Sequence, residues 1–208
     1  AVFAGGMYVF PGGRVDHNDG EGDNGFLVAA IRECYEEAGV LLAEEGEGQL
    51  VRDGHIALSQ REAVHDGTLD IHTLCARHQL RLATERMAWV AWWVTPKGES
   101  PRRFDTRFFL AVAPEDQKLV HDHSETIASR WLRPAEAIDC GRRGEMMLMP
   151  PTIANLEFLS QFDSADAALV AGRQIGTPPR IQPHIRFGDD GKMIAIVMPG
   201  EAGYDALD

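Results

Sequence analysis

The sequence predicts an α/β fold, because segments with helical spacing and segments with strand character alternate along its 208 residues. Helical spacing marks residues 23–38, where apolar side chains gather on one side of the predicted helix. Strand character marks residues 87–94, MAWVAWWV, and residues 104–113, FDTRFFLAVA, which are rich in apolar and aromatic side chains. A turn sequence, TPKGESP, separates these two strands, so we expect them to pair as a hairpin or as near neighbours.

The chain before the first helix is predicted to be mostly loop. Residues 7–10, MYVF, could form a short strand, and residues 10–25 are rich in Gly, Asp and Asn. Asp23 or Asn24 is expected to cap the start of the following helix. Gly39 suits the left-handed residue beyond its end and would support the helix there.

Further helices and a hairpin are expected in the rest of the chain. Residues 43–85 are interpreted as a helical insertion, with helical spacing in HIALSQREAVHDG and in LDIHTLCARHQL. Pro134 opens a short helix. The C-terminal part, about 150–200, is predicted to contain a proline-initiated helix, a weaker helix and a hairpin of HIRF and MIAIVMPG. We expect residues 1–208 to form a single domain.

Composition and charge narrow the class of protein. The chain is 44% hydrophobic and 25% charged, which is typical of a globular protein. No apolar run approaches the roughly 20 residues that a membrane span requires. The formal net charge of −12 argues against non-specific binding to nucleic acid or to anionic membranes, both of which attract positive surfaces. We therefore predict neither nucleic acid nor membrane as a partner.

The three cysteines, Cys34, Cys75 and Cys140, are odd in number and widely spaced, and no CxxC pair occurs. We interpret them as reduced, buried thiols of a cytoplasmic protein.

Three carboxylates crowd one side of the first helix. Because a helix turns by about 100° per residue, Glu33, Glu36 and Glu37 share roughly 100° of its surface. The apolar residues fall on the opposite side and are expected to pack. Like charges at this spacing repel each other, so a hard divalent cation above the acids would stabilise them. Oxygen ligands favour Mg²⁺, Mn²⁺ or Ca²⁺ over zinc, whereas a solvated acidic face is the alternative interpretation.

Two neighbouring features favour the metal site. The loop FPGG places Gly12 and Gly13 just upstream, where backbone N–H groups can approach an anionic substrate. The helix also contains R-E-C-Y-E-E-A-G-V, which matches the core of the Nudix box, R-E-U-x-E-E-x-G-U with U apolar, at all seven specified positions. The chain therefore resembles the Nudix hydrolase superfamily.

The resemblance implies a fold, a reaction and a set of ligands. The fold would be an α/β/α sandwich around a mixed sheet. The reaction would be metal-dependent hydrolysis of a nucleoside diphosphate linked to another moiety. Mg²⁺ or Mn²⁺ would be held by Glu33, Glu36 and Glu37, and Arg32 would orient these glutamates.

The sequence departs from the family pattern in front of the helix. The family pattern is G-x5-E-x7-R-E, but Gly13 and Arg32 are 19 positions apart instead of 14, so about five residues are inserted. Asp19 stands where the pattern has its first glutamate. The role of that glutamate is unassigned here, and we favour a structural role over a catalytic one.

Other segments resemble one branch of the superfamily, which contains the mammalian peroxisomal coenzyme A diphosphatase and bacterial homologues. They are WVTP, RRFDTRFFLA, SRWLRPAEA and a late MPGE-x-G-Y. The branch suggests coenzyme A or acyl-coenzyme A as substrate, with ADP-ribose or NADH as the alternative. A module that senses a nucleotide without cleaving it is a second alternative. Many relatives are dimers, so a homodimer is compatible with the resemblance. Because only twelve residues precede Gly13, we expect the first strand of the domain to lie before Ala1.

The general base is expected among Glu37, Glu36 and Glu125. Glu125 lies in the loop VHDHSETIASRW, where similar proteins often place an acid that completes the site. A carboxylate facing solvent is the alternative for Glu125. His121 and His123, in the same loop, are interpreted as solvated histidines.

Arg103 and Arg107 flank the start of the second strand and are candidates for contact with a substrate phosphate, because the arginine fork matches phosphate oxygens. A salt bridge with Asp105 or with another acid is the alternative. The tryptophans of residues 89–93 are interpreted as core packing, with stacking on adenine as the alternative.

Overall fold

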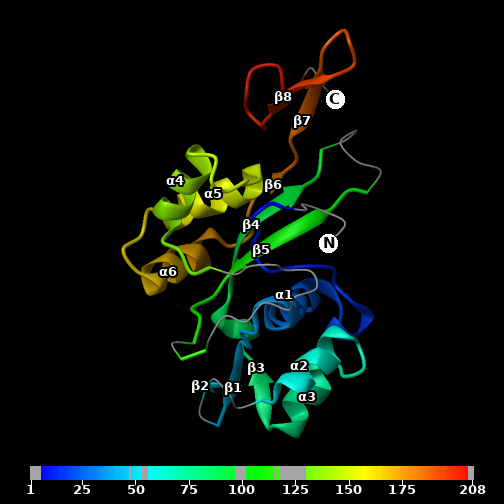
Figure 1. The fold of residues 1–208 in the computed structure, drawn as a ribbon, viewed down its shortest axis with the longest axis vertical. Helices are drawn as coiled ribbons and strands as arrows, with labels where there is room; N and C mark the ends of the chain where they lie inside the picture. Colours follow the sequence, from blue (N-terminus) through cyan, green and yellow to red (C-terminus); the bar gives the residue numbers. More distant parts are fainter. Residues whose placement is uncertain are drawn as a thin grey trace. The chain divides into compact units, whose positions relative to one another are not determined.

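The computed structural model describes residues 6–46, 48–52, 56–96, 102–114, 116–117 and 130–205 (Figure 1). By the contacts between residues, the chain divides into two compact units. The first unit comprises Ala1–Ala88 and Ala111–Val170, and the second comprises Trp89–Leu110 and Ala171–Asp208.

Helix α1, Gly22–Ala38, is the longest helix that the structure describes. Glu21 occupies its N-cap position, so the prediction that Asp23 or Asn24 caps the helix was wrong. The helix begins earlier than predicted, at Gly22. Gly39 has a φ of 75°, and its N–H donates to the carbonyl of Tyr35 at 3.0 Å. The predicted left-handed residue at the end of the helix is therefore confirmed.

The segment of residues 43–85 contains the two expected helices, α2 (Leu58–His65) and α3 (Ile71–Arg77). It also contains a small antiparallel sheet of order β2-β1-β3, which was not predicted. Its strands span only two or three residues each, too few to show an alternating pattern. They are β1 (Ala43–Glu45), β2 (Gln49–Leu50) and β3 (Leu80–Leu82), and the 3-10 turn η2 (Thr84–Arg86) follows.

The apolar core of the first unit lies between α1 and this segment. Ile31 and Tyr35 of α1 are buried, as the helical pattern predicts, whereas Cys34 and Leu27 are only half-buried. The core continues into α2, α3 and the small sheet, and its members include Val28, Leu41, Val51, Val64, Ile71, Leu74 and Leu80. The segment of residues 43–85 is therefore packed against α1 as part of one core.

The remaining helices are α4 (Pro134–Arg142), α5 (Pro150–Leu159) and α6 (Ala165–Ile175). Prolines open α4 and α5, as predicted, because a residue in the first turn needs no N–H for the helix. The expected strand at residues 7–10 is reduced to one parallel bridge, in which the N–H of Tyr8 donates to Met147 O at 2.9 Å.

The second unit contains a three-stranded sheet of order β5-β4-β6 and a separate hairpin. The expected pairing of the two aromatic strands and the expected C-terminal hairpin are both confirmed. β4 and β6 run parallel, whereas β7 and β8 are antiparallel, so the fold is α/β with mixed sheets, as predicted. The strands are β4 (Ala88–Val94), β5 (Asp105–Leu110), β6 (Arg180–Ile181), β7 (His184–Phe187) and β8 (Met193–Val197).

The structure also bears on the expectation of buried, reduced cysteines and on that of no membrane span. All three cysteines are free, but only Cys75 is buried, whereas Cys34 and Cys140 are half-buried. Burial raises the pKa of the Cys75 thiol to about 11. Among the residues that the structure describes, no helix is both long enough and apolar enough to cross a membrane.

Asp70 caps helix α3 and supplies a test of the fold. Its carboxylate accepts hydrogen bonds from the backbone N–H of Thr73 at 2.8 Å and from the Thr73 hydroxyl at 2.6 Å, which lower the pKa of Asp70. We expect Asp70→Ala to reduce the free energy of unfolding by about 1 kcal/mol at pH 7. Because the folded pKa is lowered, this contribution is present above about pH 4 and is lost as the pH falls through that pKa. Urea unfolding at several pH values measures it.

The matched control is Asp66→Ala, which removes an exposed aspartate at the end of α2. It should change stability by less than about 0.5 kcal/mol. Equal losses in the two variants, or a loss in Asp70→Ala that grows at low pH, would contradict the cap.

Candidate active site

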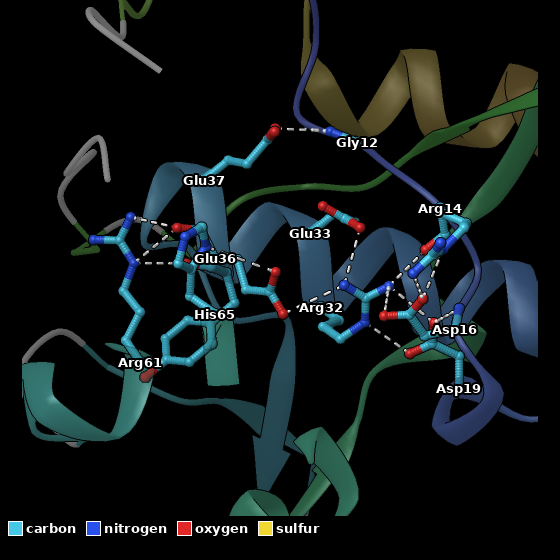
Figure 2. Close-up of polar contacts among 11 residues, drawn as sticks. Gly12, Arg14, Asp16, Asp19, Arg32, Glu33, Glu36, Glu37, Arg61 and His65 are labelled. Carbon is cyan, nitrogen blue, oxygen red and sulfur yellow. Dashed lines mark hydrogen bonds and ion pairs between the residues drawn. The ribbon is translucent and has the colours of Figure 1, made fainter. Parts of the chain in front are cut away.

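The site is organised by a buried ion pair between the loop before α1 and α1 itself. Asp19 ends the 3-10 turn η1 (His17–Asp19), and its side chain is 1% exposed. Arg32 donates to both of its oxygens, from Nε to Oδ1 and from Nη2 to Oδ2, each at 2.9 Å (Figure 2). Asp19 Oδ2 also accepts the backbone N–H of Asp16 at 2.7 Å. The aspartate at the position of the missing box glutamate is therefore a structural partner of Arg32, which agrees with the role that we favoured.

The same guanidinium also reaches the acids of α1. Arg32 Nη1 donates to Glu33 Oε1 at 2.9 Å and to Glu36 Oε1 at 3.3 Å. Arg32 Nη2 donates to the carbonyl of Arg14 at 2.7 Å, which fixes the loop from a second point. Figure 2 shows Arg32 between the loop on one side and the two glutamates on the other. Arg32 uses one oxygen of each glutamate, so it leaves the second oxygen of each carboxylate to other partners.

The glycine loop approaches the other end of the acidic cluster. The N–H of Gly12 donates to Glu37 Oε2 at 2.9 Å. A Cβ atom at Gly13 would lie 2.4 Å from Glu33 Oε1, far inside the van der Waals distance. A side chain at position 13 would therefore displace the Glu33 carboxylate from its present position, and the two glycines contact two different acids of the box.

Glu36 is buried, although helical spacing placed it on the side of α1 that was not expected to pack. Only 8% of the residue is exposed, because α2 packs beside it. His65 Nδ1 lies 4.0 Å from Glu36 Oε2, and Arg61 donates to the Glu36 carbonyl from Nη2 at 2.7 Å. The prediction of three acids on an open face is therefore corrected: Glu33 and Glu37 are half-buried and Glu36 is buried.

Burial and mutual repulsion both act on these carboxylates. Burial raises the pKa of Glu33 and of Glu36, and the charge of Arg32 acts in the opposite direction. Nearby acids add to the rise: Asp16 and Asp19 for Glu33, and Glu33 for Glu36. A group of acids whose pKa values rise for these reasons is one that a cation would stabilise in the ionised form.

The donor set fits a hard divalent cation in its chemistry. Glu33, Glu36 and Glu37 offer only carboxylate oxygens, which Mg²⁺ and Mn²⁺ prefer. Within the described part of the chain, however, no three His, Cys, Asp or Glu side chains already converge on one point. Rotation of the glutamate side chains is needed to bring their oxygens together.

Comparison with known proteins identifies the family. The sequence family described as the NUDT19 Nudix domain matches residues 20–159, which include all of α1. The chain belongs to the Nudix hydrolase family. A crystal structure of a Nudix hydrolase from Alicyclobacillus acidocaldarius superposes with a TM-score of 0.72 and 27% identity, covering 81% of this chain and 82% of that one. The expected family and fold class are both confirmed.

Two curated Nudix proteins are also similar to this chain in sequence. Putative nudix hydrolase 7 of Caenorhabditis elegans is 29% identical over 98% of this chain and 66% of its own length. The human acyl-coenzyme A diphosphatase NUDT19 is 30% identical over 88% of this chain and 51% of its own length. The chain thus spans about half to two thirds of the length of these relatives.

The other predicted site residues lie either outside the described residues or in the second unit. Glu125, His121 and His123 lie outside the described residues, so their roles stay predictions. Arg103 and Arg107 belong to the second unit, whereas the glycine loop and the glutamates belong to the first. Arg103 Nε donates to the carbonyl of Thr95 at 3.1 Å.

Arg107 contacts aromatic rings of the same unit. Its guanidinium carbon lies 4.6 Å from the ring centre of Trp89 and 5.4 Å from that of Trp92. Asp105, one of the alternative salt-bridge partners, accepts a hydrogen bond from Trp92 Nε1. Trp93 is buried, as core packing predicts, whereas Trp89 and Trp92 are half-buried beside the arginine.

Sequence reasoning missed the contribution of α2. Arg61 and His65 were treated only as part of a helical pattern, although they stand four residues apart and so share one face of α2. That spacing was the available signal. The pattern could not show that this face meets α1.

Asp19 and Asp16 allow a matched test of the ion pair. We expect Asp19→Asn to lower the free energy of unfolding by about 3 kcal/mol, because it leaves the buried Arg32 charge without its forked partner. Asp16→Asn should cost less than about 1 kcal/mol, because the Asp16 side chain is 45% exposed and lies 3.9 Å from Arg32. Urea unfolding at pH 7 gives both values, and similar losses in both variants would contradict a buried organising pair.

Proposed function

We propose that this chain catalyses metal-dependent hydrolysis of a pyrophosphate bond in a nucleoside diphosphate linked to another moiety. Coenzyme A or acyl-coenzyme A is the proposed substrate. The observation that carries the proposal is the arrangement of the Nudix box: Arg32 binds one oxygen of Glu33 and one of Glu36, and the glycine loop contacts Glu33 and Glu37.

Glu33, Glu36 and Glu37 would hold Mg²⁺ or Mn²⁺. When bound there, such an ion neutralises pyrophosphate oxygens and lowers the pKa of a coordinated water. The residues of the chain prepare the site. Arg32 orients Glu33 and Glu36 by binding one oxygen of each, and its charge opposes the rise in their pKa values. The Gly12 N–H holds the Glu37 carboxylate toward the loop. Glu37, Glu36 and Glu125 are the candidates to accept a proton from the attacking water.

The substrate proposal is supported by the relatives. Human NUDT19 is named an acyl-coenzyme A diphosphatase, and so are the matched proteins of Xenopus laevis and Gallus gallus. ADP-ribose and NADH contain the same kind of bond and are the competing substrates. A homodimer and a single domain over residues 1–208 stay proposals as well.

A product assay tests the function. The protein is incubated separately with coenzyme A, acetyl-coenzyme A, ADP-ribose and NADH, with Mn²⁺, with Mg²⁺ and without added metal, and the products are identified by mass. We expect an adenosine 3',5'-bisphosphate and a phosphopantetheine from coenzyme A only when metal is present. Glu37→Gln should lower kcat at least 100-fold, because it removes the charge of a proposed metal ligand. Thermal stability should not change, because glutamine is nearly isosteric with glutamate and the position is only half-buried.

The other results of the product assay would change the proposal in different ways. Cleavage of only ADP-ribose or NADH would keep the reaction and discard the substrate. No cleavage of any substrate would favour the nucleotide-sensing module. Full activity in Glu37→Gln would overturn the assignment of the metal site to α1.

Gly13 supplies a separate prediction. Gly13→Ala should weaken Mn²⁺ binding about tenfold or more, because its Cβ would displace the Glu33 carboxylate. Gly12→Ala is the matched comparison, since a Cβ there meets no heavy atom of the described residues within 4 Å. Mn²⁺ binding to each protein, followed by electron paramagnetic resonance, should show a clearly smaller loss for Gly12→Ala. Equal losses would show that contact with Glu33 is not what requires glycine at position 13.

A further inference from the structure

Helix α2 contacts the box helix through one buried arginine. Arg61 is 7% exposed, and its side chain crosses to the last turn of α1. Its Nε donates to the carbonyl of Tyr35 at 2.8 Å and to that of Glu36 at 3.2 Å, and its Nη2 donates to the Glu36 carbonyl at 2.7 Å. Figure 2 shows this fork beside Glu36, on the side opposite to Arg32.

These contacts match what the end of a helix requires. The last four carbonyls of a helix have no N–H partner within it, and the negative end of the helix dipole attracts a cation. The Tyr35 carbonyl already accepts the Gly39 N–H, so Arg61 adds a second donor there. At the Glu36 carbonyl it supplies two N–H donors and a positive charge. It therefore stabilises the turn that carries Glu36 and Glu37, although their carboxylates would otherwise be unfavourable near this end of the helix.

Glu36 is consequently held from two sides. Its carboxylate is bound through Oε1 by Arg32, and its main chain is bound by Arg61. His65, one turn further along α2, lies 4.0 Å from Glu36 Oε2. Because the backbone of a ligand sets where its side chain can reach, a fixed main chain limits the positions open to the Glu36 oxygens.

We propose that Arg61 is a positioning residue for the metal site, so that helix α2 sets part of the geometry of that site. It acts by fixing the last turn of α1, which orients Glu36 and Glu37 toward the cation. This inference rests on the proposed function. Partners that orient metal ligands without touching the metal typically change metal affinity 10–100-fold when they are removed.

The test separates positioning from general stability. Arg61→Met removes the donors and the charge, and Arg61→Lys keeps the charge but loses the forked geometry. Val64→Ala is the matched control, because Val64 lies on the same helix, is 3% exposed, and belongs to the apolar core. For each protein, thermal stability is measured, together with Mn²⁺ binding in the absence of substrate and kcat as a function of Mn²⁺ concentration.

We expect the dissociation constant for Mn²⁺ to rise 10–100-fold in Arg61→Met and by a smaller factor in Arg61→Lys. The Mn²⁺ concentration that gives half-maximal activity should rise in parallel. Val64→Ala should lower thermal stability while leaving the dissociation constant for Mn²⁺ within about twofold of the wild type. If Arg61→Met does not fold, Arg61→Lys carries the same comparison against Val64→Ala.

Two results would overturn the proposal in distinguishable ways. If the Arg61 variants lose stability but keep the Mn²⁺ affinity of the wild type, Arg61 is a helix cap without a positioning role, and the proposed function stands. If the wild-type protein itself binds no Mn²⁺ and cleaves no substrate, the proposed function fails, and this inference fails with it.

Discussion

One buried guanidinium connects the loop before α1 to the acids on α1. Arg32 is 8% exposed, and a charge in such a place costs several kcal/mol unless partners surround it. Asp19 supplies a forked partner, Glu33 and Glu36 supply one oxygen each, and Arg14 supplies a carbonyl. The loop, the helix and the carboxylates are therefore positioned by one group, and the orientation of each depends on the others.

A second arginine makes the arrangement two-sided. Arg32 reaches the acids from the start of the box motif, and Arg61 reaches the last turn of α1 from α2. Between them lie carboxylates whose pKa values are raised by burial. Such a site keeps carboxylates close together at an electrostatic cost, which a bound cation would offset.

The sequence predicted most of what local patterns encode. The helix of the box, its glycine end, the aromatic strand pair and the C-terminal hairpin all follow from periodicity and turn residues within short windows. The strands β1, β2 and β3 are too short for periodicity, so they were missed. The cap was placed too late because α1 begins at Gly22, before both candidates, and no local pattern marked Glu21 as its cap.

In the candidate site, too, the sequence predicted the features that depend on local spacing and missed those that depend on packing. The motif named the three glutamates, Arg32 and the glycines, because their spacing is local. It could not show that Asp19 pairs with a residue 13 positions away, or that Arg61 reaches a carbonyl 25 positions away. Contacts at such separations depend on how helices pack. For the same reason, helical spacing put Glu36 on an open face, although a neighbouring helix covers it.

The Asp19–Arg32 ion pair also connects the end of η1 to the middle of α1. The family pattern separates these points by eight positions, and here they are 13 apart. Ten of the twelve residues between Asp19 and Arg32 belong to α1, so the five additional residues do not form a flexible loop. Asp19 reaches Arg32 because η1 lies against α1. The added length is therefore taken up by rigid helix, and the ion pair ties η1 to that helix ten residues beyond its start.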